Sequence, residues 1–170
     1  LGYKSHVIKD YFYKYNILNS DFQIDISSGS IKPYKNNSHS WKVSLIHTGV
    51  ETMTGGRLLR LKEHLIEDTF LLTYGDAVAD LDINKVIEFH KSHGKLVTVT
   101  AVRPPARFGE INIDKQNKVI SFLEKPQTTQ GWINGGFFVM EPSFFDYISD
   151  DKTVLEKSPL ENAAKDNQLM

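Results

Sequence analysis

The chain has 170 residues, of which 40% are hydrophobic and 24% charged, and these values are ordinary for a globular protein with a sizeable core. Its formal net charge of −1 gives no sign of a nucleic-acid or membrane-surface binder, and the lack of cysteine excludes disulfides, thiolate chemistry and cysteine-ligated zinc. Because no apolar run approaches the ~20 residues of a membrane span and no signal peptide opens the sequence, we expect a cytoplasmic protein.

The first third of the chain predicts a helix, two strands and a long polar segment. Apolar side chains in residues 3–15 recur at helical spacing, and residues 22–26 alternate as a half-buried strand does. Residues 27–42 are polar and too long for an ordinary connection, so we expect an excursion or ribbon there and interpret it as a candidate subunit contact. Residues 43–47 predict a further strand.

A pair of glycines beside hydroxyl residues marks the start of the next predicted helix. The sequence is Thr52-Met53-Thr54-Gly55-Gly56-Arg57, followed by leucines on one helical face. Such a helix start can present backbone N–H groups to an anion or to the edge of a base. A plain loop with a threonine cap explains the same residues, and the local sequence leaves both interpretations open.

The middle of the chain predicts a strand, a helix and a second strand. Residues 69–73 form an apolar run, residues 83–93 form a helix with Asp82 and Gly94 at its ends, and residues 96–102 form a β-branched strand. The three elements predict a right-handed βαβ unit with parallel strands.

Two candidate sites for metal lie in this unit. Asp76 follows the first strand directly after Gly75, where open α/β sheets place ligand-binding groups, so we predict that Asp76 holds a metal ion against a nucleotide phosphate. His90 and His93 stand one turn apart on the helix and could form a metal pair. Since no third ligand accompanies them, surface or internally bonded histidines are the simpler interpretation.

The last third predicts a hairpin, a strand and two helices. Residues 108–113 and 118–123 alternate on either side of a turn at 114–117, and residues 132–140 form a strand interrupted by paired glycines. The two helices begin at Pro142 and at the capping box Ser158-Pro159-Leu160-Glu161. The alternation of helices and strands predicts an α/β fold with a mixed, mostly parallel, Rossmann-like sheet and helices on both faces.

Polar insertions stand at three predicted strand ends, in the order Gly75-Asp76, Glu124-Lys125-Pro126 and Asn134-Gly135-Gly136, and Phe137-Phe138 follows the last of them. In this order they resemble the sugar-phosphate nucleotidyltransferase family, and the resemblance covers essentially the whole chain. The residues around Met53 and Asp80 are more similar to the cytidylyl-transferring branch than to the thymidylyl or uridylyl branches. The longer stretches that carry this likeness are 52–57, 73–80 and 105–109.

The resemblance implies a reaction of CTP with α-D-glucose 1-phosphate that gives CDP-glucose and diphosphate, in the supply of dideoxyhexoses for the O-antigen of lipopolysaccharide. It implies Mg²⁺ as cofactor, with Asp76 as metal ligand and with Asp76 and Lys125 as catalytic residues. It implies that Thr52, Thr54, Gly55, Arg57 and Gly75 bind the nucleotide. It implies that Gly109, Glu124, Lys125, Asn134 and Gly135 bind the sugar phosphate.

This chemistry suits the residues, because the reaction needs positioning and charge neutralisation rather than a covalent intermediate, and a carboxylate suits Mg²⁺. Simpler interpretations stay open for several of them. Arg57 could be a solvated helix-start cation, and Glu124 and Lys125 could be rim charges, because neighbours on a strand point to opposite faces. Asp80 is expected to have only a local role.

The chain also departs from the family. Neither the family's glycine-rich triphosphate loop nor its second metal-binding aspartate has a match in residues 1–170. We therefore expect an internal fragment, a single incomplete nucleotidyltransferase domain that does not turn over by itself, and a homo-oligomer for the whole enzyme. Two alternatives stay open, namely an enzyme that uses UTP or dTTP, and a non-catalytic domain that binds a sugar nucleotide.

Overall fold

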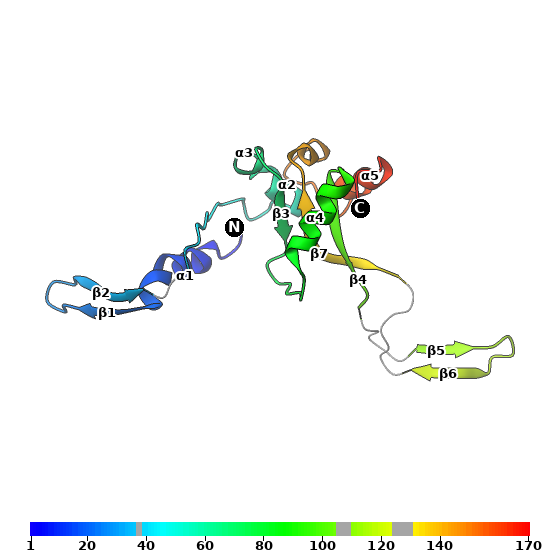
Figure 1. Cartoon of the computed structure of the whole chain (residues 1–170), viewed down its shortest axis with the longest axis horizontal. Coiled ribbons are helices and arrows are strands. Elements are labelled where there is room, and N and C mark those ends of the chain that lie inside the picture. Colours follow the sequence, from blue (N-terminus) through cyan, green and yellow to red (C-terminus); the bar gives the residue numbers. More distant parts are fainter. Residues whose placement is uncertain (37–38, 105–109, 124–130) are drawn as a thin grey trace.

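The computed structural model describes residues 1–36, 39–104, 110–123 and 131–170. A body of helices around a small sheet lies in the middle, and two hairpins extend from it in opposite directions (Figure 1). The elements are α1 (Ser5–Leu18), β1 (Ser20–Ile24), β2 (Ile31–Asn36), α2 (Thr54–Leu59), α3 (Lys62–Leu65), β3 (Phe70–Thr73), α4 (Ile83–His93), β4 (Val97–Val102), β5 (Glu110–Ile113), β6 (Val119–Leu123), β7 (Ile133–Met140), the 3₁₀-helix η1 (Pro142–Tyr147) and α5 (Ser158–Lys165).

The central sheet has three strands in the order β3-β7-β4, and β7 is antiparallel to both neighbours. β3 and β4 therefore run parallel, as predicted, but they do not pair with each other. The predicted α/β class is confirmed, whereas the expectation of mostly parallel pairing is wrong for the described strands. Their single parallel contact is the bridge between Val97 and Leu169. β7 suits the central place because residues 137–140 are apolar and largely buried on both faces.

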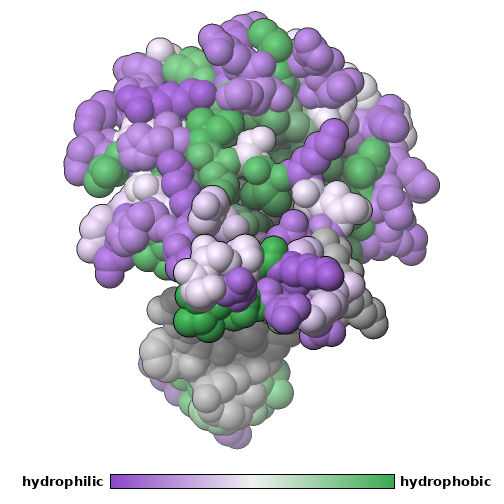
Figure 2. Space-filling view, turned by 90° about the vertical axis from the view of Figure 1, so that its left-hand side faces the viewer, coloured by the Kyte–Doolittle hydropathy of each residue, from purple (hydrophilic) through white to green (hydrophobic). Residues whose placement is uncertain are grey.

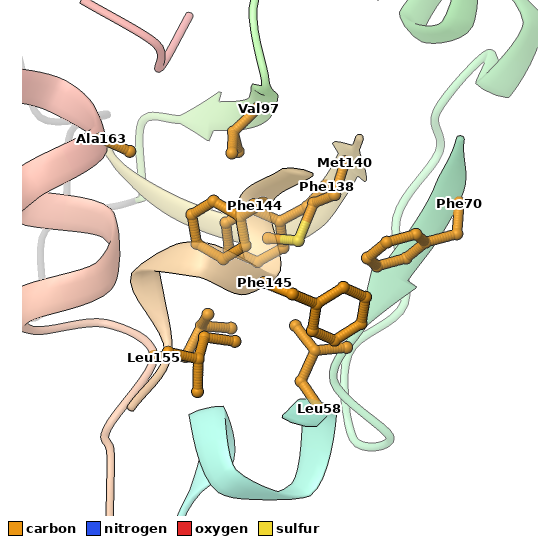
Figure 3. Packing of buried hydrophobic residues seen from close by; sticks show 10 residues of the cluster. Leu58, Phe70, Val97, Phe138, Met140, Phe144, Phe145, Leu155 and Ala163 are labelled. Atoms are coloured by element: carbon orange, nitrogen blue, oxygen red, sulfur yellow. The ribbon is translucent and has the colours of Figure 1, made fainter. Parts of the chain in front are cut away.

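One face of the sheet carries the hydrophobic core (Figure 3). Phe70, Met140 and Val97 are cross-strand neighbours, so their side chains share this face, and Phe144 and Phe145 of η1 pack against them. Burying a phenylalanine side chain contributes about 1.5–3 kcal/mol. The other members of the core are Leu58, Phe138, Ile148, Leu155 and Ala163.

Helix α4 lies on the opposite face, because its His90 bonds to Thr98 while the adjacent Val97 points into the core. Helices therefore cover both faces of the sheet. The predicted caps of α4 are confirmed, since the Asp82 carboxylate accepts the N–H groups of Asn84 and Lys85, and Gly94 has a φ of 62°.

Both histidines of α4 belong to one hydrogen-bonded chain. The Lys95 N–H donates to His93 Nδ1 (2.9 Å), which leaves His93 Nε2–H to donate to Thr98 Oγ1 (2.7 Å). The Thr98 hydroxyl then donates to His90 Nδ1 (2.8 Å), and His90 Nε2–H donates to Glu141 Oε1 (3.0 Å). Every ring nitrogen has a partner when both imidazoles are neutral, so the interpretation of internally bonded histidines is confirmed.

Other local predictions had mixed outcomes. The hairpin of β5 and β6 is confirmed, with the Asp114 carboxylate accepting two turn N–H groups and Asn117 at a φ of 64°. The strand predicted at 43–47 is wrong, because these residues form no strand: Ile46 O accepts a hydrogen bond from the Leu1 amino group (2.6 Å), and the neighbouring Thr48 N–H donates to the Leu1 carbonyl (2.8 Å). The helix predicted after residue 57 is divided into α2 and α3.

The last two helices also differ from prediction. The element at Pro142 is a 3₁₀-helix. The capping box at Ser158 does not form, because Ser158 is already the first helical residue and the N-cap, Lys157, makes no side-chain bond. The Glu161 N–H instead donates to the Lys157 carbonyl (2.9 Å).

The N-terminal arm consists of α1, β1 and β2, and β1 and β2 form an antiparallel hairpin that takes up part of the 27–42 segment. None of the 14 residues of α1 is buried. Hydrophobic side chains are visible among hydrophilic ones on the side of the molecule from which the arm projects (Figure 2). No helix among the described residues is long and apolar enough to cross a membrane.

Candidate functional site

Asp76 lies in a turn just after β3 and is exposed, as its position at a strand end predicts. The space beside Gly75 is open, because a Cβ atom placed there would meet no atom within 4 Å. The described residues hold no cluster of three histidine, aspartate or glutamate side chains that could bind a metal ion. An exposed single carboxylate still fits Mg²⁺, which keeps several of its waters, so this role of Asp76 stays a prediction.

A hydrogen-bonded network joins the end of β3 to β7 and to the start of α2. The Tyr74 hydroxyl donates to Glu156 Oε1, and the Thr54 hydroxyl donates to Glu156 Oε2 at 2.7 Å. On its other side the Tyr74 oxygen faces Asn134 Nδ2 at 3.4 Å. The network therefore links two predicted site residues, Thr54 for the nucleotide and Asn134 for the sugar, through Tyr74 and Glu156.

The protonation of this network is well defined. Partial burial, together with the bond to Glu156, raises the pKa of Tyr74 to about 12, so its hydroxyl keeps its proton at neutral pH. Burial opposes ionisation of Glu156, but the hydroxyls of Tyr74 and Thr54 outweigh it and lower the pKa of that carboxyl. Glu156 is therefore a carboxylate that accepts two hydroxyl hydrogens.

Asn134 has a fixed orientation at the end of β7. Its Oδ1 accepts the Gly136 N–H at 2.8 Å, so its Nδ2 must face Tyr74. Gly136 has a φ of 78°, and a Cβ there would press on the Tyr74 ring, so glycine lets that ring lie against the strand.

Gly135 is needed for packing, since a Cβ at this position would lie 2.8 Å from the Thr100 carbonyl of β4. Beside it lies a pocket of about 330 Å³ lined by Thr100, Trp132, Asn134 and Glu156, among others. The Thr100 Oγ1 atom is buried there without a hydrogen-bond partner among the described residues. A pocket with an aromatic ring, an amide and a carboxylate has the side chains that sugars commonly contact, although the predicted sugar-binding roles of Asn134 and Gly135 stay predictions.

The start of α2 packs tightly against residues 151–155. The N–H groups of Gly55 and Gly56 both donate to the Thr153 carbonyl, at 3.0 and 3.2 Å. A Cβ on Gly55 would lie 2.8 Å from that same oxygen. The idea that these N–H groups are free for an anion is therefore wrong, and the glycines serve close packing instead. Thr52 is buried in the same turn.

Arg57 points away from this network. Its guanidinium donates to Thr48 Oγ1 (3.0 Å) and to the Val50 carbonyl (3.2 Å), beside Gly2. It is therefore not merely a solvated cation, since it ties α2 to the 48–50 loop. Its predicted contact with the nucleotide stays a prediction.

Three predicted site residues, Gly109, Glu124 and Lys125, lie outside the described residues. Two residues of the network were missed by the sequence analysis. Tyr74 directly precedes Gly75-Asp76, and its place in that stretch was the one signal that could have pointed to it. Glu156 lies 82 residues further along the chain, and no sequence pattern pairs it with Tyr74.

The chain is similar to several known proteins. The glucose-1-phosphate cytidylyltransferases of Salmonella typhimurium LT2 and Salmonella typhi are each 46% identical to this chain over an alignment of 170 residues that covers 99% of this chain and 66% of each relative. The mannose-1-phosphate guanylyltransferase catalytic subunit beta of Dictyostelium discoideum is 29% identical over an alignment of 158 residues that covers 90% of this chain and 44% of the relative. The chain thus spans about two thirds of the length of the cytidylyltransferases.

A solved structure has the same fold. HddC from Yersinia pseudotuberculosis, complexed with GMP-PN, superposes with a TM-score of 0.59 at 24% identity, over 92% of this chain and 60% of that chain. Residues 32–166 match the family described as "Nucleotidyl transferase". Since that match takes in most of the chain, including β3, α4, β4, β7 and the network around Glu156, the chain belongs to the nucleotidyl transferase family.

Proposed function

We propose that the enzyme containing this chain transfers a cytidylyl group from CTP to α-D-glucose 1-phosphate. The observation that carries the proposal is the 46% identity to glucose-1-phosphate cytidylyltransferases over 99% of the chain. The guanylyltransferase from Dictyostelium, at 29%, is a more distant relative. The network supports the proposal, because Thr54, a predicted nucleotide residue, bonds to the Glu156 carboxylate, and Asn134, a predicted sugar residue, is joined to that carboxylate through the Tyr74 hydroxyl.

In the proposed reaction, a phosphate oxygen of glucose 1-phosphate attacks the α-phosphorus of CTP. The bond from that phosphorus to the oxygen bridging to the β-phosphorus breaks, and diphosphate leaves. Positioning and charge neutralisation carry such a transfer. Asp76 would hold a Mg²⁺ ion, which neutralises charge on the phosphates when bound. Lys125 would bind the phosphate of the sugar phosphate, and Asn134 would bind a sugar hydroxyl.

The proposal is tested by measuring diphosphate release from the full-length enzyme with CTP, UTP, dTTP or GTP, glucose 1-phosphate and Mg²⁺. We expect the highest kcat/KM with CTP, CDP-glucose as the product, and loss of activity when the metal is chelated. An Asp76→Asn variant should lose at least about 100-fold in kcat/KM while its melting temperature stays unchanged, because Asp76 is exposed. A preference for another nucleotide, or full activity of the variant, would contradict the proposal.

We propose further that the whole enzyme is a homo-oligomer held partly through the N-terminal arm. The arm exposes large apolar side chains, among them Tyr11, Tyr13 and Ile26 at 56%, 86% and 84% of their surface, and these favour burial against another surface. Deleting residues 28–40 from the full-length protein should lower the mass measured by light scattering. An unchanged mass would count against this contact.

The biological setting follows from the proposed product. CDP-glucose would supply a pathway to dideoxyhexoses of the O-antigen of lipopolysaccharide, and the enzyme would work in the cytoplasm, where CTP is made. Loss of the dideoxyhexose from surface polysaccharide after deletion of the gene would support this role, and an unchanged polysaccharide composition would oppose it.

A further inference from the structure

The start of α2 has little donor capacity left for a ligand. The Met53 N–H donates to the Asp151 carbonyl at 2.9 Å, and the N–H groups of Gly55 and Gly56 donate to the Thr153 carbonyl. Each amide carries a single hydrogen, so these three donors are already used. This stretch differs in that respect from a helix N-terminus with free amides, which attracts acceptors.

Thr54 is an exposed residue at this helix start, and two of the three hydrogen-bonding positions of its hydroxyl are occupied. It donates its hydrogen to Glu156 Oε2 at 2.7 Å and accepts the Leu155 N–H at 2.9 Å. A hydroxyl has one hydrogen and two lone pairs, so one lone pair remains. Thr54 can therefore accept a hydrogen bond from a ligand but cannot donate one while Glu156 holds its hydrogen.

Glu156 fixes the direction of the hydrogen bond that the Thr54 hydroxyl makes. An ionised carboxylate has no hydrogen to give, so a hydroxyl beside it must act as the donor. The Tyr74 hydroxyl donates to the other oxygen and keeps the carboxylate oriented between β3 and α2. Bonds to a charged acceptor are also stronger than neutral ones, which makes reversal of the Thr54 hydroxyl costly.

We propose that Glu156 is a positioning residue for base selection. By holding the Thr54 hydrogen it leaves only an acceptor toward the nucleotide, and the exocyclic amino group of cytosine is a hydrogen-bond donor. Uracil and thymine carry a carbonyl oxygen at the same place, which would meet the Thr54 lone pair without a hydrogen between them. This inference rests on the proposed cytidylyl transfer and on the predicted contact of Thr54 with the nucleotide, and it adds the atom that favours cytosine.

The first test is a Glu156→Gln variant of the full-length enzyme. The glutamine amide can donate to Thr54 Oγ1 and release the threonine hydrogen for a carbonyl. We expect the ratio of kcat/KM for CTP to that for UTP to fall at least about tenfold, mainly through KM. Glu161→Gln is the matched control, because Glu161 is exposed on nearby α5 and lies outside the network, and its ratio should stay at the wild-type value.

Two further variants keep the test decisive if Glu156→Gln does not fold. Thr54→Val removes the acceptor and should lower the CTP-to-UTP ratio, whereas Thr54→Ser keeps the hydroxyl and should retain it. An unchanged ratio in Thr54→Val, or in a folded Glu156→Gln, overturns the inference. Ultraviolet titration of Tyr74 is an independent readout, because losing the carboxylate should bring its pKa down from about 12.

Failure of the inference and failure of the proposed function give different results. If the function is wrong, the wild-type enzyme shows no preference for CTP, and no variant needs to be made. If only the inference is wrong, the wild type prefers CTP and the Thr54→Val enzyme keeps the same preference.

Discussion

The body of the molecule buries its aromatic side chains, whereas the N-terminal arm leaves its own exposed. Phe144 in the body is 0% exposed, and Tyr13 in the arm is 86% exposed. Both regions have apolar side chains at regular spacing, so the difference does not come from the local pattern. In the body, strands from distant parts of the chain supply the partner for each apolar face.

In the arm, fewer segments are available to cover the apolar side chains of α1. α1 faces the returning segment at 39–45, and a groove of about 1010 Å³ lies between them, lined by Phe12, Tyr15 and Trp41, among others. A helix of 14 residues is marginal in water without a packed face. The comparison shows that amphipathic spacing predicts that a helix will bury a face but does not say what will cover it.

The largest effect is expected when an aromatic residue is replaced by alanine in the body, compared with the same replacement in the arm. Phe144→Ala should lower the free energy of unfolding by about 3–5 kcal/mol, because it opens a cavity in the core. Tyr13→Ala in the arm should change it by less than about 0.5 kcal/mol. Urea denaturation of both variants measures the difference, and similar losses would mean that the arm has a core of its own.

The next comparison uses two glycines within the body. Gly56→Ala should cost about 1–3 kcal/mol, since the new methyl group would press on the backbone of Asp151. Gly75→Ala should leave stability unchanged, because the space around it is open. If Gly75→Ala nevertheless raises KM for CTP, the predicted contact of Gly75 with the nucleotide gains support. Thermal melts and initial rates are the two measurements.

A smaller effect is expected for Tyr74→Phe in the full-length enzyme. The ring keeps its contact with Phe138, but Asn134 and Glu156 lose the hydroxyl that joins them. We expect KM for glucose 1-phosphate to rise about 5–10-fold with little change in melting temperature, in keeping with the loss of about one hydrogen bond. Tyr147→Phe is the matched control, since the Tyr147 hydroxyl donates to Asp166, outside the network, at 2.9 Å.

The smallest effect concerns pH. Burial, and then the nearby His90 and Lys95, lower the pKa of His93 in the folded protein. As the pH falls, His93 is therefore protonated in the unfolded chain before it is protonated in the folded protein. The free energy of unfolding should decline once the pH drops below ~6.5, and it should go on declining until the pH has passed the pKa of His93 in the folded protein. Glu141 also belongs to this network, and its own pKa is lowered. Urea midpoints between pH 7.5 and 5.5 measure the decline.

A His93→Gln variant should show a weaker decline in that range, with His6→Gln in the arm as the control. If the two variants depend on pH in the same way, the His93 network does not contribute.

Much of the fold could be predicted because its signals are local. The helical spacing of α1, the caps of α4 at Asp82 and Gly94, and the turn between β5 and β6 each depend on residues within a few positions of one another. The place of Asp76 after β3 was predictable for the same reason, since an apolar run that ends in Gly-Asp indicates a strand end. The segment at 43–47 has a similar apolar sequence, but it does not pair with any described strand.

Only the tertiary structure decided which distant residues meet. The sequence by itself determined the α/β class, most of the elements and the family resemblance of the stretches around Asp76 and Asn134. It did not determine that β7 enters between β3 and β4, or that the glycines of α2 pack on residues 151–155. Those outcomes depend on the order of strands in the sheet, which brings Glu156 to Tyr74 and Thr54 across 82 and 102 positions of sequence. Periodicity and capping act over a few residues, and so they carry no information about contacts at that range.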